Sequence, residues 1–306
     1  MPMEWAAEHE ITAETAAALV GERFPELRGA PVEPLATGWD NTVFRVGGDW
    51  AFRFPRRKIA VPGVEREIAT LAALAPGLPL PIPVPRYVGE PGGGFPWPFW
   101  GARLVPGREM AEVRPPDGRR AAIGAAVGRF LRVLHDPALV RTAGAGLPVD
   151  PLRRGDPAYR ATPAAERLDR LAARGLWERD PAVDAFVGAA RENAVPPAGE
   201  PVIVHGDLHV RHVLLGPGGA ASGVIDWGDV CLADPAVDLS LAYAAFAGDD
   251  RAAFLDAYGP VPPDRERAAR VLALFIAATL AEYAASEARP ALLAESLAGI
   301  GRALAP

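Results

Sequence analysis

Lysine is nearly absent from this chain, because Lys58 is the single lysine among the 32 basic residues of a 306-residue sequence. We interpret this scarcity mainly as genome composition, in line with the abundance of alanine, glycine, proline and arginine. Any reaction that needs a lysine therefore has one candidate. The basic residues form no lysine- or arginine-rich block, and 38 acidic residues give a net charge of −6. Because nucleic-acid binders normally carry a basic stripe, we expect no nucleic-acid partner.

Cysteine is equally scarce, since Cys231 is the only one. A single cysteine excludes a disulfide framework within the chain and is typical of a reducing cytoplasm, where we expect the protein to reside. The first five residues have neither the basic nor the apolar region of a secretory signal. The most apolar run, residues 271–281, has 11 residues, too few to cross a bilayer. We therefore expect no membrane association.

Apolar material is present in quantity: 50% of the residues are hydrophobic and 23% are charged, which is sufficient for a folded core. The length corresponds to two domains or one large one. Residues 1–105 have the pattern of a small mixed unit, and residues 106–306 that of a larger, mainly helical unit, with Pro106-Gly107 at the junction. The predicted fold class is α+β.

In the first unit, residues 42–46 and 50–54 read as two strands around Gly47-Gly48-Asp49, a spacing typical of a hairpin. Strand alternation places Ala51 and Arg53 on the face opposite three aromatic residues. A helix is predicted from Pro62 to Leu74, with Glu67 beside its apolar stripe. The remaining expectations are a helix over 13–23, a loop over 35–41, and strands over 86–88 and 99–105.

The second unit contains a short β-rich island in which three of the five histidines fall at 205, 209 and 212. Asp207 lies among them, and Asp226 follows the last apolar strand. Titratable side chains at the ends of short strands are what a catalytic loop on a rigid scaffold needs. Helices are predicted over 117–135, 163–174, 181–193, 236–246, 250–258, 264–287 and 291–303.

Two motifs in this island carry a resemblance. Residues 204–215 read Val-His-Gly-Asp-Leu-His-Val-Arg-His-Val-Leu-Leu, and residues 224–229 read Val-Ile-Asp-Trp-Gly-Asp. Together they resemble the paired signature of the aminoglycoside phosphotransferase family, which includes macrolide phosphotransferases. In the first unit, residues 38–41, 50–53 and 65–67 resemble the nucleotide-covering loop, third strand and glutamate-bearing helix of that family.

The resemblance implies a bilobal protein-kinase-like fold. Residues 1–105 would form a small β-rich nucleotide-binding lobe with one key helix, and residues 106–306 a larger, mainly helical catalytic and substrate-binding lobe. It also implies transfer of the γ-phosphate of ATP or GTP to a hydroxyl of a small molecule, most of all an aminoglycoside or macrolide antibiotic. Sugar or amino-alcohol acceptors stay open, and the sequence does not indicate an oligomeric state.

Within that reaction, Asp207 would be the catalytic base and Asp226 a ligand of Mg²⁺, which prefers carboxylate oxygen. His212 stands where the family usually places an asparagine metal ligand. Because imidazole is a poorer ligand for Mg²⁺, His212 either ligates the metal or hydrogen-bonds a phosphate oxygen or Asp226.

The nucleotide phosphates need a cation, and Arg53 is the predicted one because Lys58 lies beyond Pro55, outside the strand. Glu67 is predicted to anchor Arg53. The resemblance adds further residues to the nucleotide site, namely Gly38, Asn41 and Ala51, with Arg103 and Val105 at a hinge.

Other polar residues of the island favour structural roles. We expect His205 to brace the catalytic turn, His209 to have a structural role, and Asp234 to cap a helix. His135, which ends an apolar helix, is predicted to be a core histidine with its hydrogen bonds satisfied.

Two alternative functions stay open at this point. The cluster of His205, Asp207, His209 and His212, with Asp226, is also compatible with a metal-dependent hydrolase. Because His212 departs from the common pattern, a non-catalytic kinase-like binding module is the second alternative.

Overall fold

The computed structural model describes residues 7–193, 196 and 199–306. The start of the chain, where no secretory signal is predicted, lies mostly outside these residues. The chain divides into two compact units. The small unit contains the residues up to Pro76 together with Ile82–Val105 and Trp227–Asp229, and the large unit contains Gly77–Pro81, Pro106–Asp226 and Val230–Pro306.

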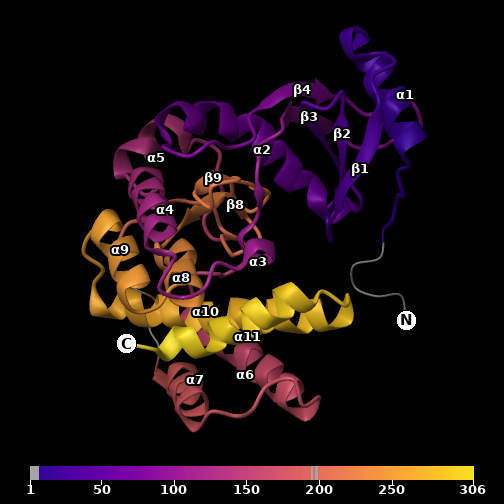
Figure 1. Cartoon of the computed structure of the whole chain (residues 1–306). Coiled ribbons are helices and arrows are strands. Elements are labelled where there is room, and N and C mark those ends of the chain that lie inside the picture. The colour runs from indigo at the N-terminus through magenta and orange to yellow at the C-terminus, as the bar shows by residue number, and fades with distance from the viewer. Residues whose placement is uncertain (1–6, 194–195, 197–198) are drawn as a thin grey trace. The chain divides into compact units, whose positions relative to one another are not determined.

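The small unit is built on an antiparallel sheet with the strand order β1-β2-β3-β5-β4 (Figure 1). Phe52, Phe54 and Phe99 point to one face and pack with helix α1, while Trp100 and Ala102 pack with helix α2 on the other. This two-faced burial follows from strand alternation. The elements are α1 (Ala13–Arg23), β1 (Val32–Thr37), β2 (Asn41–Val46), β3 (Trp50–Pro55), α2 (Val61–Leu74), β4 (Pro85–Gly89) and β5 (Phe99–Arg103), with 3₁₀ turns at Pro25–Leu27, Lys58–Ala60 and Ala75–Gly77.

The predicted hairpin and the two helices of this unit are confirmed, whereas the predicted loop over 35–41 is wrong in its first half. Strand β1 continues to Thr37, because Ala36 and Thr37 pair with Val43 and Thr42 of β2 after a register shift at Pro34. Turn-forming residues from Gly38 onward end the strand, so the loop is shorter than predicted.

The large unit consists of helices around two small sheets, β6-β8-β9 and β7-β10. In Figure 1 the last two helices, α10 and α11, run side by side, and α4 lies against α9. The helices are α3 (Met110–Val113), α4 (Ala121–Leu134), α5 (Pro137–Ala143), α6 (Pro157–Ala173), α7 (Pro181–Asn193), α8 (Ala236–Ala245), α9 (Gly248–Tyr258), α10 (Pro263–Ser286) and α11 (Pro290–Leu304). The strands are β6 (Arg108–Glu109), β7 (Val202–Val204), β8 (Val213–Leu215), β9 (Ala221–Val224) and β10 (Cys231–Ala233).

Helix α6 begins six residues before its predicted start at residue 163. The side chain of Asp156 accepts a hydrogen bond from the Tyr159 N–H at 3.0 Å, and Pro157 occupies the first turn. A capping aspartate followed by proline is a stronger start signal than the internal Pro163. The short helices α3 and α5 were not predicted.

Helix α10 contains the apolar run 271–281 but extends beyond it on both sides. With 24 residues, it is long and apolar enough to cross a membrane by length and composition. The helix agrees with the one predicted over 264–287, and only the apolar length taken from the 11-residue run was too short. Because 61% of its most apolar window is buried within the protein, its apolar side chains fit those of a core helix.

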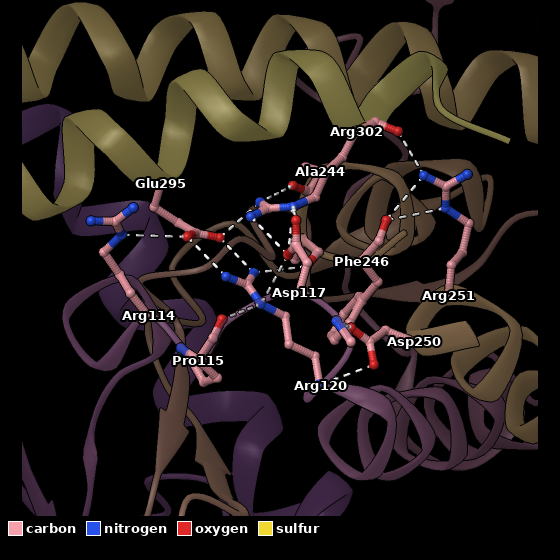
Figure 2. A network of polar contacts seen from close by, with 12 residues as sticks. Arg114, Pro115, Asp117, Arg120, Ala244, Phe246, Asp250, Arg251, Glu295 and Arg302 are labelled. Atoms are coloured by element: carbon pink, nitrogen blue, oxygen red, sulfur yellow. Dashed lines mark hydrogen bonds and ion pairs between the residues drawn. The ribbon is translucent and has the colours of Figure 1, made fainter. Parts of the chain in front are cut away.

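A buried cluster of charges joins α11 to the start of α4 (Figure 2). Arg120 donates from Nη1 and Nη2 to the two carboxylate oxygens of Glu295, at 2.6 and 3.0 Å. Arg302 donates to Glu295 at 2.9 Å and to Asp117 at 3.0 Å. Arg120 and Glu295 are each at most 2% exposed, so the ion pair at the centre of this cluster is desolvated, while Asp117 at its edge is exposed.

Candidate functional site

The loop between β7 and β8 carries Asp207, and a buried aspartate of helix α8 fixes its backbone. The carboxylate of Asp238 accepts hydrogen bonds from the N–H groups of His205, at 2.7 Å, and Gly206, at 3.0 Å. Gly206 has φ of 88°, a conformation that glycine adopts without steric cost. The sharp turn before Asp207 is therefore held by a charge-assisted contact.

Two buried histidines complete this support. The Nδ1 atom of His205 accepts from the Asp207 N–H at 3.2 Å, so its Nε2 carries the hydrogen that is donated to the Ile225 carbonyl at 3.0 Å. Burial lowers the pKa of His205. His135 contacts Asp238 at 3.2 Å and the Tyr258 hydroxyl at 3.0 Å. The structure confirms that His205 braces the turn and that His135 is a core histidine with its hydrogen bonds satisfied.

The carboxylate of Asp207 contacts Arg154, whose Nη1 also donates to the Gly206 carbonyl at 2.7 Å. On the other carboxylate oxygen, His209 Nε2 lies 3.6 Å away. Burial alone would raise the pKa of Asp207, but the Arg154 guanidinium, together with His209 and His212, holds that pKa well below its usual range. Asp207 is therefore ionised, as a group that receives a hydroxyl hydrogen must be.

His212 connects Asp207 to Asp226. Its Nδ1 lies 2.8 Å from the Asp207 carbonyl oxygen, which can only accept, so Nδ1 carries the hydrogen. Its Nε2 lies 3.4 Å from a carboxylate oxygen of Asp226. Possible ligand atoms of Asp207, His209 and His212 all lie within 4.8 Å of one another. This part of the large unit thus presents several groups that can hold a cation.

In the small unit, the predicted contact between Arg53 and Glu67 is present. Arg53 Nη1 donates to Glu67 Oε1 at 2.9 Å, and Glu67 is fully buried. The same oxygen accepts the Trp227 N–H at 3.1 Å, and Oε2 accepts the Trp100 indole N–H at 3.2 Å. One buried carboxylate therefore joins β3, β5 and the residue that directly follows Asp226.

Asn41 and Gly38 lie near the same strand. In the amide orientation that satisfies both groups, the Asn41 oxygen accepts from Arg53 Nε at 3.1 Å and Nη2 at 3.0 Å. The Gly38 carbonyl accepts from Arg56 at 2.7 Å. Lys58 is exposed in a 3₁₀ turn after the strand.

The other residues assigned to the nucleotide site by resemblance occupy ordinary strand positions. Ala51 is half-buried opposite Ala102. Arg103 is 73% exposed, and its side chain pairs with Asp49 at 3.1 Å. Val105 is half-buried at the end of the segment that follows β5. No contact described here tests a nucleotide role for them, so those roles stay predictions.

Sequence reasoning missed Arg154 and Asp238 as parts of the site. Asp234, the predicted cap, accepts from the Ala236 N–H at 2.8 Å and also pairs with Arg265. Asp238 gave no comparable signal in the sequence. Its spacing of 32–33 residues from the loop it holds gives no local pattern, and Arg154 lies 53 residues from Asp207.

Residues 31–271 match the phosphotransferase enzyme family, and the chain belongs to this family of enzymes. It is 31% identical to an aminoglycoside 3′-phosphotransferase of Streptomyces fradiae over 211 residues, covering 61% of this chain and 70% of that protein. It also matches an uncharacterized Bacillus subtilis protein, YcbJ, at 38% identity over 56 residues, which is only 18% of either chain.

Solved structures show the same fold. The GDP and kanamycin complex of APH(2″)-IIIa has a TM-score of 0.69 at 21% identity, covering 94% of this chain and 97% of that one. The macrolide 2′-phosphotransferase MphH from Brachybacterium faecium has a TM-score of 0.60 at 23% identity, covering 94% and 98%. The predicted α+β class and protein-kinase-like fold, with its β-sheet lobe and helical lobe, are confirmed.

Proposed function

We propose that this enzyme transfers the γ-phosphoryl group of ATP or GTP to a hydroxyl of a small molecule. One observation carries the proposal: the buried carboxylate of Glu67 binds both Arg53 and the backbone of Trp227, which directly follows Asp226. The cation that we assign to the phosphates is thereby held by the same carboxylate that binds the backbone next to the proposed metal ligand. Such positioning is most of what phosphoryl transfer asks of a protein.

Asp207 accepts the proton of the acceptor hydroxyl in this reaction. The acceptor oxygen forms a bond to the γ-phosphorus, the bond from that phosphorus to the bridging β-oxygen breaks, and the nucleoside diphosphate leaves. Because Arg154 keeps Asp207 ionised, its carboxylate orients the hydroxyl over the whole physiological pH range. This carboxylate orients the acceptor hydroxyl before it takes the proton, which suits a loose transition state.

Asp226 and His212 are the residues that would hold Mg²⁺. The lone pair of His212 Nε2 and an oxygen of Asp226 face each other at 3.4 Å, an arrangement of two acceptors that a cation or a proton between them stabilises. Mg²⁺ supplies neutralisation of phosphate charge when bound. Since imidazole is a poor Mg²⁺ ligand, Asp226 would be the stronger ligand of the two.

The acceptor we propose is a hydroxylated antibiotic of the aminoglycoside or macrolide type. The relatives support this class, since the Streptomyces fradiae protein is named for aminoglycosides, one neighbour was solved with kanamycin, and another is named for macrolides. The GDP in the kanamycin complex makes GTP a donor to test beside ATP.

Release of nucleoside diphosphate and formation of phosphorylated product, measured with each nucleotide and a panel of aminoglycosides and macrolides, tests the proposal. Asp207→Ala should abolish transfer while nucleotide affinity stays within a few-fold, because its carboxylate serves the acceptor. Asp249→Ala, which removes an exposed carboxylate of α9, is the matched control and should keep full activity. Near-normal transfer by Asp207→Ala would contradict the assignment.

The metal role has its own variant. Asp226→Asn should raise the Mg²⁺ concentration needed for half-maximal activity and lower turnover, because one anionic ligand is lost. Wild-type activity that is independent of divalent cations would refute this role.

The three ligand atoms grouped at Asp207, His209 and His212 keep the hydrolase as a second candidate, although the family assignment does not support it. Metal analysis of the purified protein separates the two. Stoichiometric zinc or manganese favours hydrolysis, whereas Mg²⁺-dependent nucleotide binding favours transfer. Nucleotide binding without any transfer would instead identify a binding module.

A further inference from the structure

Arg154 lies on a loop whose conformation is fixed on several sides. The side chain of Asp150 accepts the N–H groups of Arg154, at 2.6 Å, and Gly155, at 2.8 Å. The backbone of the same loop is bonded to β10 through Asp150 N–H to Leu232 O, at 2.8 Å, and Leu232 N–H to Pro148 O, at 2.9 Å. Asp150 has φ of 32°, which is uncommon outside glycine and persists where the surroundings enforce it.

This loop delivers a positive charge to the catalytic carboxylate. The Arg154 side chain is 22% exposed and that of Asp207 is 32% exposed, so the pair stands at the surface that an acceptor must approach. The guanidinium also binds the Gly206 carbonyl and is thereby attached to the catalytic loop at two points. An acceptor hydroxyl that reaches Asp207 must come within a few ångströms of this cation.

Further arginines extend the positive charge next to the loop. Arg160 donates to the carbonyl oxygens of Leu152 and Arg153 and lies 4.9 Å from the Phe275 ring centroid. Burial and then the charge of Arg154 lower the pKa of Arg160. Phe275 has a second arginine over it, Arg167, at 5.7 Å.

Two carboxylates of the large unit, one on α10 and one on β6, are each shared by two arginines. Glu282 of α10 binds Arg167 at 2.7 Å and Arg170 at 2.6 Å. Glu109 binds Arg211, which stands four residues after Asp207, at 3.2 Å, and Arg289 at 3.4 Å. These acidic groups are thus already neutralised, and they offer little net negative charge to an incoming cation.

We propose that Arg154 is a specificity-determining residue that selects neutral or anionic acceptors and disfavours polycationic ones. A guanidinium repels an ammonium group brought beside it, so a cation next to the reacting position discriminates against polycationic acceptors. This inference rests on the proposed function, since it takes Asp207 as the group that receives the acceptor hydroxyl. It narrows the antibiotic class to acceptors without clustered ammonium groups near the reacting hydroxyl.

Kanamycin and its fully N-acetylated derivative are suitable probes, because the derivative keeps every hydroxyl and carries no ammonium group. The dissociation constant of each is measured by calorimetry with saturating GDP, and transfer is measured separately with GTP. We expect the wild type to bind the acetylated compound at least tenfold more tightly than kanamycin. Arg154→Gln should tighten kanamycin binding tenfold or more, and Arg154→Lys, which keeps the charge, should retain the wild-type preference.

Arg153→Gln is the matched control. This variant removes one arginine charge from the neighbouring position in the chain. The Arg153 side chain is 62% exposed and pairs with Asp156, so the ratio of the dissociation constants of kanamycin and its acetylated derivative should change by less than threefold. The inference is refuted if kanamycin binds the wild type and Arg154→Gln with equal affinity. It is also refuted if kanamycin binds neither protein. These binding measurements need no turnover, whereas failure of every acceptor to release nucleoside diphosphate would refute the proposed function instead.

Discussion

At the scale of single residues, Arg53 is the cation that we predict for the nucleotide phosphates, where the resemblance would lead one to expect a lysine. Its guanidinium binds Glu67 and Asn41 at the same time, which a single ammonium group on a flexible stem does with less geometric definition. The exposed Lys58 lies beyond the strand and has no comparable setting.

Arg53→Ala should weaken nucleotide affinity by one to two orders of magnitude, about 1.4–2.8 kcal/mol for the loss of a charge-assisted contact. Arg53→Lys should recover part of this loss, because the charge returns without the forked geometry. Nucleotide titration of the folded variants gives these values.

Lys58→Ala is the control for that experiment, since it removes the only lysine from an exposed turn. It should leave affinity unchanged within a factor of two. A silent Arg53→Ala together with an impaired Lys58→Ala would show that the phosphate-binding cation has been assigned to the wrong residue.

The buried imidazole of His205 makes stability depend on pH. Its folded-state pKa lies below the ordinary value of 6.5, so the unfolded chain binds the proton more readily and the free energy of unfolding falls as pH drops below that value. The slope reaches about 1.4 kcal/mol per pH unit for one such group. Burial lowers the pKa of His209 as well and adds to the effect.

Urea unfolding at pH 7.5, 6.5 and 5.5 measures this slope. His205→Gln should reduce it, because the variant has no proton to take up at that position. A free energy of unfolding that stays constant or rises over this interval would contradict the assignment of neutral, buried histidines.

At the scale of secondary structure, the sequence was informative wherever a pattern is local. The hairpin of β2 and β3 was predictable because alternation and a glycine turn lie within thirteen consecutive residues, and the Arg53–Glu67 contact followed from that alternation. The end of β1 was not predictable from the sequence, because pairing with β2 across a register shift holds its last residues, and their own strand propensity does not. Arg154 was missed for the same reason, since a contact 53 residues away leaves no periodic signal.

Helix α8 has a role that its composition does not reveal, because Asp238 connects it to the catalytic loop. Asp238→Ala should remove the acceptor of two buried N–H groups, each costing about 1–3 kcal/mol when unsatisfied. We expect lower stability and a large loss of turnover with little change in nucleotide affinity. Urea unfolding and steady-state kinetics measure both quantities.

Asp234→Ala provides the comparison on the same helix, because Asp234 caps the helix start but gives no hydrogen bond to the catalytic loop in the contacts described above. Its loss should cost about 1 kcal/mol of stability. Turnover of the two variants is compared at equal fractions of folded protein. If it falls equally in both, the loss of turnover in Asp238→Ala is not caused by loss of loop positioning.

At the scale of the whole chain, the two predicted lobes are continuous ranges, whereas the compact units exchange short segments. Trp227–Asp229 belongs to the small unit although it follows the catalytic island. A Cβ atom at Gly63 would lie 2.9 Å from the Gly228 carbonyl oxygen, so only glycine allows α2 to approach this segment. The composition of the sequence cannot reveal that residues 227–229 belong to the small unit.

The large unit depends on the charge cluster of Figure 2. Glu295→Ala should lower the free energy of unfolding by about 3–5 kcal/mol, because it leaves buried guanidinium groups of Arg120 and Arg302 without their shared carboxylate. Chemical denaturation measures this change. Glu287→Ala, an exposed residue at the end of α10, should stay within about 0.5 kcal/mol of the wild type, and equal effects of the two substitutions would show that the network contributes no net stability.

The scarcity of lysine also has a practical consequence. An exposed amine at position 58 is the one lysine side chain that an amine-reactive dye or an acetyltransferase could address, and it lies five residues after Arg53 on the same covalent segment. Among the side chains, amine chemistry therefore addresses a single position, five residues along the chain from Arg53, without any engineered cysteine. Enzymatic lysine acetylation, by contrast, can neutralise no more than one of its 32 basic side chains, so the charge of the other basic residues lies beyond the reach of that modification.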